Sequence, residues 1–403
     1  MKYLIYQDRS EISNVTYFVL FSVRKRKVIL KLNSKQGGEM LEKSWKKLKS
    51  TKVKSVGAIF MAILLIGAMA YSTTPAAAEQ KVIKLKYSTS FFPPEPPVRY
   101  ANHTLDLVEK KTNGRVKIER FMAGVLGGTL EELGLASSGA VDLISLHVDQ
   151  YAQQLPLHQI INTELIGSFA QGLASVTAIV HELEDTKPLF EAEQKKNNIK
   201  ILYFYCMGPT GITARFPAKS MADVKGKKVN VIAAYQRDVF KELGWIPVNV
   251  QIPELTEALS RGVIDAIFMA TAANVPLKWH EIGKVHLQLV DNTVFSAPLA
   301  FNLDSWNRLP ADVQTAFMEA AWETAQWTVE GTKMYVEHTY EAFEEKGAEV
   351  IKISKKESGA FFEVLFKHSM NNWLKICKTA GVEKDAKVIK KYWDKMKWGK
   401  WKK

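Results

Sequence analysis

The chain has 403 residues, 47% of them apolar and 24% charged, which excludes both a single small domain and an intrinsically disordered protein. Its formal net charge of +13 lies mainly at the two ends. Residues 1–78 hold 14 Lys or Arg against 4 acidic residues, and residues 384–403 hold 9 Lys against 2 Asp. Residues 79–383 sum to a charge near −4, which disfavours a nucleic-acid-binding domain there. The length predicts two domains of ordinary size.

The N-terminal part has the pattern of a secretory leader. Residues 56–70 read VGAIFMAILLIGAMA without a charge, six Lys between positions 43 and 54 precede them, and Ala76 to Ala78 follow. We expect a signal peptide over residues 40–78, cleaved near Ala78, and hence a periplasmic protein. The alternative is a retained membrane anchor, although this apolar segment is shorter than the roughly 20 residues that span a bilayer.

Residues 1–39 do not fit a signal peptide, because they place the apolar segment too far from the start. Residues 36–40 read QGGEM, and codons such as CAG GGA GGT GAA ATG would form a purine-rich ribosome-binding site before Met40. We therefore expect translation to begin at Met40 and residues 1–39 to be a mis-assigned start. Detection of a peptide from residues 1–39 in the precursor would refute this expectation.

Strand-like and helix-like segments alternate between residues 82 and 269. Strands are expected at residues 82–88, 116–121, 141–146, 199–205, 228–231, 248–251 and 266–269. Helices are expected at residues 98–112, 129–138, 163–184, 188–197, 235–243 and 254–261. Thr129 is the expected N-cap of the second helix, because Glu132 stands three residues later. The alternation predicts an α/β protein whose strands pair mostly in parallel through helical crossovers.

A single long helix is expected between Pro310 and Gly347. The interval contains no proline, and apolar or small residues recur at spacings of three and four from Val313 to His338. A helix of this length is about 50 Å long, which exceeds the width of a small domain. We therefore expect it to contact both lobes of a two-lobed protein.

Motifs of common enzymes are missing from the sequence. Residues 124–128 read GVLGG, without the Lys-Ser/Thr of a phosphate-binding loop, and no G-x-S-x-G occurs. His280-Glu281 begins a zinc motif, but Lys284 stands where its second His would be, so no metal site is expected. The two cysteines, Cys206 and Cys377, form either a disulfide outside the cytoplasm or two buried thiols.

Aromatic residues stand where several expected strands end. The positions are Phe91, Phe92, Tyr151, Tyr235 and Trp279. Each one by itself is explained by packing in the core. Together they suit a mostly apolar pocket, because ligands of α/β proteins bind at the carboxyl ends of strands.

Five segments resemble motifs of the DctP-type periplasmic solute-binding proteins of TRAP transporters, and they occur in that family's order. They are residues 114–128 (GRVKIERFMAGVLGG), 138–142 (SGAVD), 221–229 (MADVKGKKV), 258–265 (ALSRGVID) and 306–314 (WNRLPADVQ). The resemblance extends through most of residues 81–350. Behind a signal peptide, this combination is much more specific than any one of its motifs.

The resemblance implies a two-lobed periplasmic binding protein of type II-like architecture, with the long helix spanning both lobes. It implies a first lobe of residues 81–207 and 296–335 and a second lobe of residues 208–295 and 336–383. The lobes would close about a hinge around one small organic molecule, which is then delivered to the membrane subunits of a TRAP permease. No cofactor, nucleic acid or enzymatic activity is implied, and contact with a membrane is implied only through the permease.

The resemblance also indicates a ligand pocket. Most relatives hold a carboxylate with an arginine directly after K-G-L-K-I, but Asn230 stands at that position in this chain. A second arginine of some relatives falls on Thr210, and an asparagine of others falls near Met269. His147 falls where relatives place a polar ligand contact, with a core histidine as the alternative. The expected pocket residues are Thr89, Phe92, His147, Asp149, Met207, Asn230, Tyr235, Met269 and Trp279.

Asn230 leaves the nature of the ligand open between an organic acid and a less acidic, partly apolar molecule, because an amide cannot form a bidentate ion pair. A periplasmic enzyme on the same scaffold is the alternative function. A third possibility is a membrane-surface adaptor that uses the Lys-rich tail of residues 384–403 with Trp393, Trp398 and Trp401. The simpler interpretation of that tail is a solvated terminal helix.

Overall fold

The computed structural model describes residues 5–8, 16–23 and 26–33, and residues 81–396 apart from 94, 163–164, 167–168 and 291. The chain divides into two compact units, Met1–Gln80 and Lys81–Lys403. In the first unit, β1 (Ile5–Asp8), β2 (Thr16–Val23) and β3 (Arg26–Asn33) form an antiparallel sheet. The signal peptide expected at residues 40–78 lies outside the described residues.

The second unit contains two sheets, and the first has the order β5-β4-β6-β14-β7, with β8 paired to β14. Its strands are β4 (Ile83–Ser88), β5 (Val116–Phe121), β6 (Leu143–Ser145), β7 (Leu165–Ile166), β8 (Ile199–Gly208) and β14 (Asn292–Asn302). β4 is parallel to β5 and β6, whereas β14 is antiparallel to β6, β7 and β8. We call this sheet with its covering helices the first lobe.

The second sheet has the order β11-β10-β12-β9-β13-β15. Its strands are β9 (Thr210–Ala214), β10 (Lys228–Val231), β11 (Ile246–Asn249), β12 (Ala266–Ala270), β13 (Val285–Gln288) and β15 (Glu349–Lys352). β9 is antiparallel to both of its neighbours. This sheet and its helices form the second lobe. The expectation of mostly parallel pairing was wrong for β9 and β14, because both strands enter directly from the other sheet without a helical crossover.

Up to β12, the α-helices occur in the number and order that the sequence pattern predicts, and one of the expected helices is interrupted. They are α3 (Pro96–Lys111), α4 (Glu132–Ser137), α5 (Phe169–Thr177), α6 (Lys187–Lys196), α7 (Ala234–Glu242), α8 (Leu255–Arg261), α9 (Leu303–Arg308), α10 (Ala311–Glu345), α11 (Lys355–Thr379) and α12 (Glu383–Met396). The single helix expected over residues 163–184 is instead β7, α5 and a π-helix at Ala178–Glu182. α4 begins at Glu132 rather than beside Thr129, whose side chain faces Ser90 instead.

Six short 3-10 helices occur among the described residues of the second unit. They are η1 (Val148–Gln150), η2 (His158–Asn162), η4 (Met221–Val224), η5 (Ile252–Glu254), η6 (Thr271–Ala273) and η7 (Trp279–Glu281). Several of them follow a strand directly, so they turn the chain at the sheet edge that faces the other lobe.

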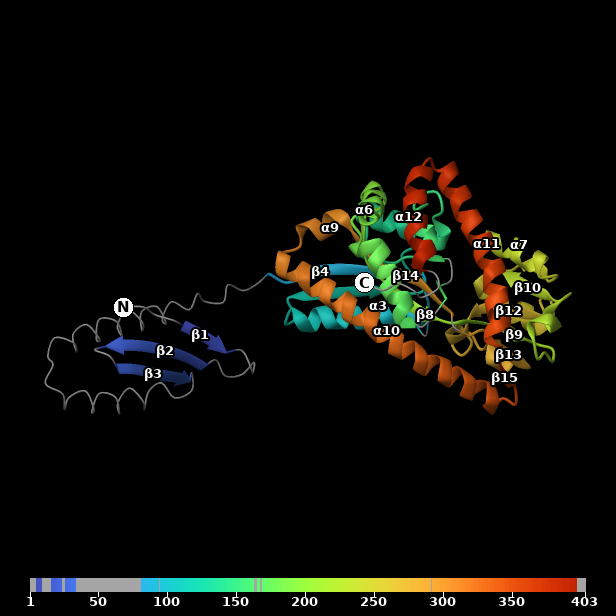
Figure 1. Cartoon of the computed structure of the whole chain (residues 1–403), viewed down its shortest axis with the longest axis horizontal. Coiled ribbons are helices and arrows are strands. Elements are labelled where there is room, and N and C mark those ends of the chain that lie inside the picture. Colours follow the sequence, from blue (N-terminus) through green and yellow to red (C-terminus); the bar gives the residue numbers. More distant parts are fainter. Residues whose placement is uncertain are drawn as a thin grey trace. The chain divides into compact units, whose positions relative to one another are not determined.

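The long helix α10 contacts both lobes, as expected, and Figure 1 shows it passing along both sheets. On the first lobe, Thr328 Oγ1 accepts a hydrogen bond from Cys206 N at 3.1 Å, and Thr332 Oγ1 donates to Cys206 O at 3.0 Å. On the second lobe, the ring of Phe343 stacks on His286 of β13 at a centroid distance of 5.1 Å. The helix therefore ties the end of β8 to the second sheet.

The C-terminal helices α11 and α12 add a second connection between the lobes. The first half of α11 places Phe361 and Leu365 in the core of the second lobe, and its second half places Met370 and Trp373 in the core of the first. α12 buries Ala386, Ile389 and Trp393 in the same first-lobe core. The expectation of a solvated terminal helix was therefore wrong for the face of α12 that carries these three residues. Because Trp393 is buried, it is not available to a lipid surface. Trp398 and Trp401 lie outside the described residues.

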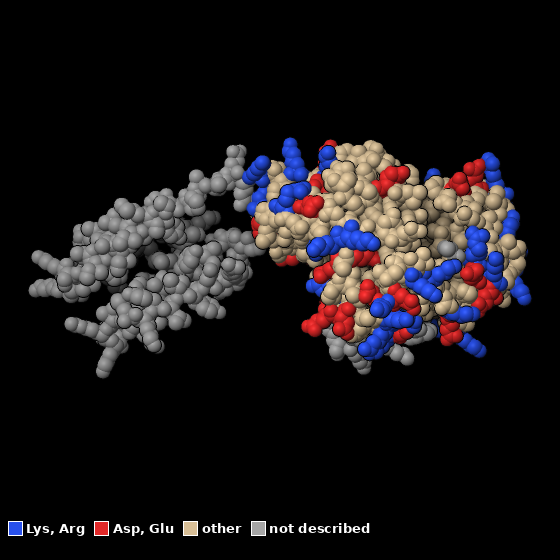
Figure 2. Space-filling model, turned by 90° about the horizontal axis from the view of Figure 1, so that it is seen from above, with Lys and Arg blue, Asp and Glu red and all other residues tan. Residues whose placement is uncertain are grey.

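The surface of the described part carries charges of both signs. Figure 2 shows Lys and Arg interspersed with Asp and Glu across the face in view, without a field of one sign. This distribution agrees with the near-neutral charge of residues 79–383. No helix among the described residues is both long and apolar enough to cross a membrane.

Candidate ligand-binding site

A cavity of about 220 Å³ lies between the two lobes. The first lobe contributes Phe91, Glu95, Pro96, Pro97, His147, Asp149, Asn162 and Met207. The second lobe contributes Thr210, Ile232, Ala233, Tyr235, Gln236, Ile252, Phe268, Met269, Ala270, Ala272, Ala273, Pro276 and Leu277. Several of these residues, such as His147 after β6, Ile232 after β10 and Ala272 after β12, follow a strand, so the ends of strands from both sheets face the same space. The lining is mainly apolar with a few polar groups, which is typical of small-molecule sites.

Five of the nine sequence-predicted pocket residues line this cavity. His147 and Asp149 follow β6, and Met207 lies near the end of β8. Tyr235 belongs to the first turn of α7, and Met269 to β12. The structure thus brings together side chains that are up to about 120 residues apart in the sequence.

Three of the other predicted residues lie elsewhere. Thr89 is fully buried, and its Oγ1 accepts a hydrogen bond from Phe91 N at 3.2 Å. Phe92 is 53% exposed, and its neighbour Phe91 lines the cavity instead. Trp279 is fully buried in a core cluster of the second lobe, where its Nε1 donates to Thr256 Oγ1 at 3.1 Å. Packing therefore accounts for Thr89 and Trp279.

Asn230, at the position of the family arginine, is fully buried and is not among the residues that line the cavity. Its Oδ1 accepts a hydrogen bond from the backbone N of Phe268 at 2.8 Å. Its Nδ2 is buried and has no hydrogen-bond partner among the described residues. The amide is therefore anchored to the backbone of β12 at Phe268. Thr210, at the position of the second arginine, does line the cavity.

Sequence reasoning missed Glu95, Asn162 and Gln236, and it named Phe91 among the aromatic residues at strand ends but not among the nine expected pocket residues. Phe91 is adjacent to the residue that was predicted, and only the bend after β4 decides which of the two rings turns inward. Glu95 lies just before α3, and its Oε1 accepts a hydrogen bond from Phe92 N at 2.8 Å. Burial raises the pKa of Glu95 above its usual value. A Glu before two prolines carries no sequence signal of a binding site.

His147 is held by a buried carboxylate. Its Nδ1 lies 3.0 Å from Glu132 Oε2, and its backbone N donates to the same oxygen at 3.1 Å. Glu132 is 1% exposed and also accepts hydrogen bonds from the N and Oγ of Ser90 at 3.0 and 2.6 Å. The ring of Phe91 stacks on the imidazole at a centroid distance of 3.8 Å. These contacts fix the ring at the cavity wall.

The pKa of His147 should be measurably raised, and Glu132→Gln should reverse the shift. Burial lowers this pKa, but the hydrogen bond and charge of Glu132, with the charges of Asp149 and Glu95, outweigh burial and raise it above 6.5. Because the folded-state pKa is the higher one, the stabilising effect of the imidazolium is complete below pH 6.5 and is lost as the pH rises through the folded-state value.

NMR titration of the histidine rings, assigned with His147→Gln, measures this pKa. In Glu132→Gln the midpoint is expected to be lower than in wild type, because the hydrogen bond to a carboxylate and the charge of Glu132, which raise the pKa, are removed while burial remains. A midpoint that does not move between wild type and Glu132→Gln would contradict this account.

The described residues contain no group of three or more side chains suited to hold a metal ion. The structure contains no disulfide between Cys206 and Cys377, and both thiols are buried. Burial raises the pKa of the Cys377 thiol to about 12.

Comparison with known proteins identifies the family. The model of the family described as bacterial extracellular solute-binding protein, family 7 (DctP), matches residues 89–372. The C4-dicarboxylate-binding periplasmic protein DctP of Rhodobacter capsulatus is 26% identical over 310 residues, which cover 75% of this chain and 90% of that protein. The range matched by the family model includes all residues that line the cavity and every strand of the two sheets except β4.

Solved structures show the same fold. A TRAP periplasmic solute binding protein from Desulfovibrio salexigens has a TM-score of 0.67 and 21% identity, with 78% of this chain and 96% of that chain covered. DctP7 of Bordetella pertussis, an extracytoplasmic solute receptor binding pyroglutamic acid, has a TM-score of 0.64 and 21% identity, with coverage of 77% and 99%.

The fold is that of a two-lobed periplasmic binding protein, as expected from the sequence. The chain belongs to the DctP family, family 7 of the bacterial extracellular solute-binding proteins. It is an extracytoplasmic solute receptor of a TRAP transporter, and the family consists of substrate-binding receptors rather than enzymes.

Proposed function

We propose that the cavity between the lobes is the solute site and that the lobes close over it. The observation that supports this proposal is the origin of the lining: His147 and Met207 come from the first lobe, and Ile232 and Phe268 from the second. A molecule bound to both sides favours the closed arrangement, and closure strengthens its polar contacts by excluding water. We further propose hinges where the chain passes between lobes, near residues 207–208, 295–296 and 335–336.

We propose that the membrane subunits of a TRAP permease receive the solute and that the mature chain is periplasmic. The uncharged segment of residues 56–70 and the three alanines that end at Ala78 support export and cleavage of the leader. Sequencing the N-terminus of the exported chain tests the cleavage: a start at Glu79 is expected, and a chain that retains residues 56–70 would contradict it.

The solved relatives are described with different ligands, so the ligand of this chain is proposed from its own cavity. The solved relatives include proteins described with orotic acid, malonate and β-D-glucuronate. For this chain we propose a small organic molecule that is either an organic acid or a less acidic, partly apolar compound. The largely apolar lining and the amide of Asn230 favour the second description.

Purified protein is expected to release about one small molecule per chain on denaturation, as measured by mass spectrometry. In Ala233→Phe the new ring occupies the cavity, so the released amount should fall at least tenfold while the fold is retained. Ala360→Phe is the matched control, because Ala360 is exposed on α11, away from the cavity lining. Equal release from Ala233→Phe and wild type would refute this location of the site.

A further inference from the structure

We propose that the solute of this receptor is an organic cation, an amine with an apolar body, rather than a carboxylate. This inference rests on the proposed solute site and names the charge of the molecule that it takes. The charged side chains that line the cavity are Glu95, Asp149 and His147, with no Lys or Arg among the described lining residues. A receptor for a carboxylate requires the opposite balance of charge.

The one cationic group at the wall is already neutralised. The imidazole Nδ1 of His147 faces Glu132 at 3.0 Å, and this carboxylate also receives the backbone N of His147. Together the two side chains carry no net charge when the imidazole is protonated. Asn230 offers no replacement, because it is uncharged, its Oδ1 accepts a hydrogen bond from Phe268 N, and it is not among the residues that line the cavity. A carboxylate in this cavity would therefore lack a cationic partner.

Glu95 and Asp149 are only partly occupied as hydrogen-bond acceptors. Glu95 uses Oε1 to accept from Phe92 N at 2.8 Å, and Asp149 uses Oδ2 to accept from Gln150 Nε2 at 2.5 Å. No hydrogen bond to Glu95 Oε2 or Asp149 Oδ1 is formed within the described residues. Each carboxylate thus keeps an oxygen for a donor, and an ammonium group supplies up to three donors.

The apolar part of the lining suits the body of such a molecule. Phe91 and Tyr235 are aromatic residues of the lining, and Met207 and Met269 add flexible thioether side chains. The ring of Phe268 packs instead against Phe240 and Phe361 in the core of the second lobe. Aromatic faces attract cations through the ring quadrupole, and the attraction grows when water is excluded by closure. The same rings give no comparable gain to an anion.

The electrostatics of Glu95 favour the same charge. Burial raises the pKa of Glu95, which shows that its carboxylate is desolvated without enough compensating positive charge. A cation beside it restores that charge, whereas an added carboxylate increases the repulsion.

Arg99 is a cationic side chain close to the cavity. It lies in the first turn of α3, four residues after Glu95, and lines an adjacent hollow that shares Pro96, Ala272 and Pro276 with the cavity. Its guanidinium sits 4.5 Å from the ring centroid of Tyr335, on the long helix α10. Arg99 is therefore held against α10 and not among the residues that line the solute cavity.

The test uses matched probes on the same aromatic and aliphatic skeletons: primary amines, the corresponding alcohols and the corresponding carboxylates, at equal concentrations. Thermal shift of the purified mature chain identifies the class that binds, and calorimetry gives the affinity of the best probe. Amines are expected to raise the melting temperature more than their matched alcohols, and carboxylates least. Stabilisation by carboxylates above their matched amines would overturn the proposal and would indicate that Arg99 turns into the cavity.

Variants separate charge from shape. Glu95→Gln and Asp149→Asn each keep the side-chain shape, and each is expected to weaken the best amine about 10- to 100-fold, the effect of losing one charge-assisted hydrogen bond. Glu119→Gln removes the same charge from an exposed site on β5 and should leave the affinity unchanged. Equal amine affinities in Glu95→Gln, Asp149→Asn and wild type would also overturn the proposal.

The same experiments give a different result if the cavity is not the solute site. If no amine, alcohol or carboxylate stabilises the chain, and Ala233→Phe releases as much small molecule as wild type, then the cavity is not the solute site. That outcome contradicts both inferences, whereas a preference for carboxylates contradicts only the charge.

Discussion

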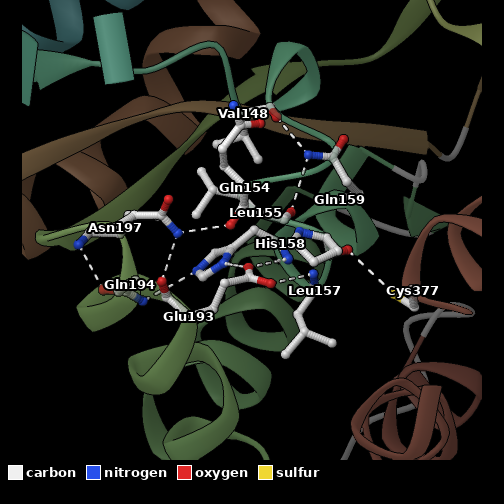
Figure 3. A network of polar contacts seen from close by, with 12 residues as sticks. Val148, Gln154, Leu155, Leu157, His158, Gln159, Glu193, Gln194, Asn197 and Cys377 are labelled. Atoms are coloured by element: carbon white, nitrogen blue, oxygen red, sulfur yellow. Dashed lines mark hydrogen bonds and ion pairs between the residues drawn. The ribbon is translucent and has the colours of Figure 1, made fainter. Parts of the chain in front are cut away.

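Replacing Glu193 with alanine is expected to lower the free energy of unfolding by about 3–5 kcal/mol. Glu193 of α6 is 7% exposed, and its carboxylate accepts hydrogen bonds from the backbone N of Leu157 at 2.8 Å and of His158 at 3.1 Å. It also lies 2.5 Å from Nδ1 of His158, which is fully buried. Figure 3 shows these contacts converging on the one carboxylate. Alanine leaves all three donors buried without an acceptor.

The same network connects to neighbouring elements, so the loss is not local. Gln194 Nε2 lies 3.2 Å from His158 Nε2, and Gln194 Oε1 accepts from Ile201 N of β8 at 2.8 Å. Pro156 O accepts from Trp373 Nε1 of α11 at 3.0 Å. The 3-10 helix η2 is thereby fixed between α6, β8 and α11, and Asn162 at its end lines the cavity.

Urea unfolding measures the effect, with Glu191→Ala as the control on the same helix. Glu191 is exposed and forms a surface pair with Lys187 at 3.8 Å, so its removal should change stability by no more than about 0.5 kcal/mol. A loss at Glu193 that is no larger than the loss at Glu191 would contradict the role of the buried carboxylate.

Gly208→Ala is expected to destabilise the protein by about 2–4 kcal/mol. Gly208 ends β8, where the chain passes to the second sheet, and its φ of 85° is a conformation that L side chains rarely adopt. A Cβ there would lie 2.4 Å from Cγ2 of Thr332. Thr332 cannot easily withdraw, because its Oγ1 is hydrogen-bonded to Cys206 O at 3.0 Å and to Tyr100 OH at 3.2 Å.

Two further variants isolate the cause. Gly359→Ala, in the second turn of α11 with no atom within 4 Å of an added Cβ, should stabilise the protein by about 0.5–1 kcal/mol. Thr332→Ser removes the clashing methyl group and keeps the hydroxyl, so it should recover part of the loss when combined with Gly208→Ala. Chemical denaturation of the four proteins measures these differences. A neutral Gly208→Ala would show that neither backbone conformation nor the contact with α10 restricts this position.

Helices and strands could be predicted where the spacing of apolar residues and the residues that end each segment indicate the same element. The strand at residues 228–231 and the helix α10 were predicted nearly to their ends, because alternation or three- and four-residue spacing was uninterrupted. The antiparallel placement of β9 and β14 was not predictable, since strand direction depends on which sheet the chain enters. The helical pattern of residues 163–184 did not reveal the π-helix, because the local composition stays helical through it.

The candidate site was predictable in outline and not in detail. The resemblance located Met207 and Met269 at the cavity, but Asn230 does not line it, and its amide is hydrogen-bonded to the backbone of Phe268 instead. The carboxylate behind His147 was also missed, because Glu132 belongs to a different element and only the tertiary fold brings the two together. The sequence pattern therefore did not determine where a side chain ends or which distant residues form a pair.

Small-angle X-ray scattering of the purified mature chain tests the central claim most directly. The chain is measured after its small molecules have been removed by denaturation, dialysis and refolding, and again after the released fraction has been added back. We expect the radius of gyration to decrease on addition in wild type and in Ala360→Phe but not in Ala233→Phe, whose cavity is filled. A radius of gyration that stays the same in wild type at saturation would contradict closure of the two lobes around a solute.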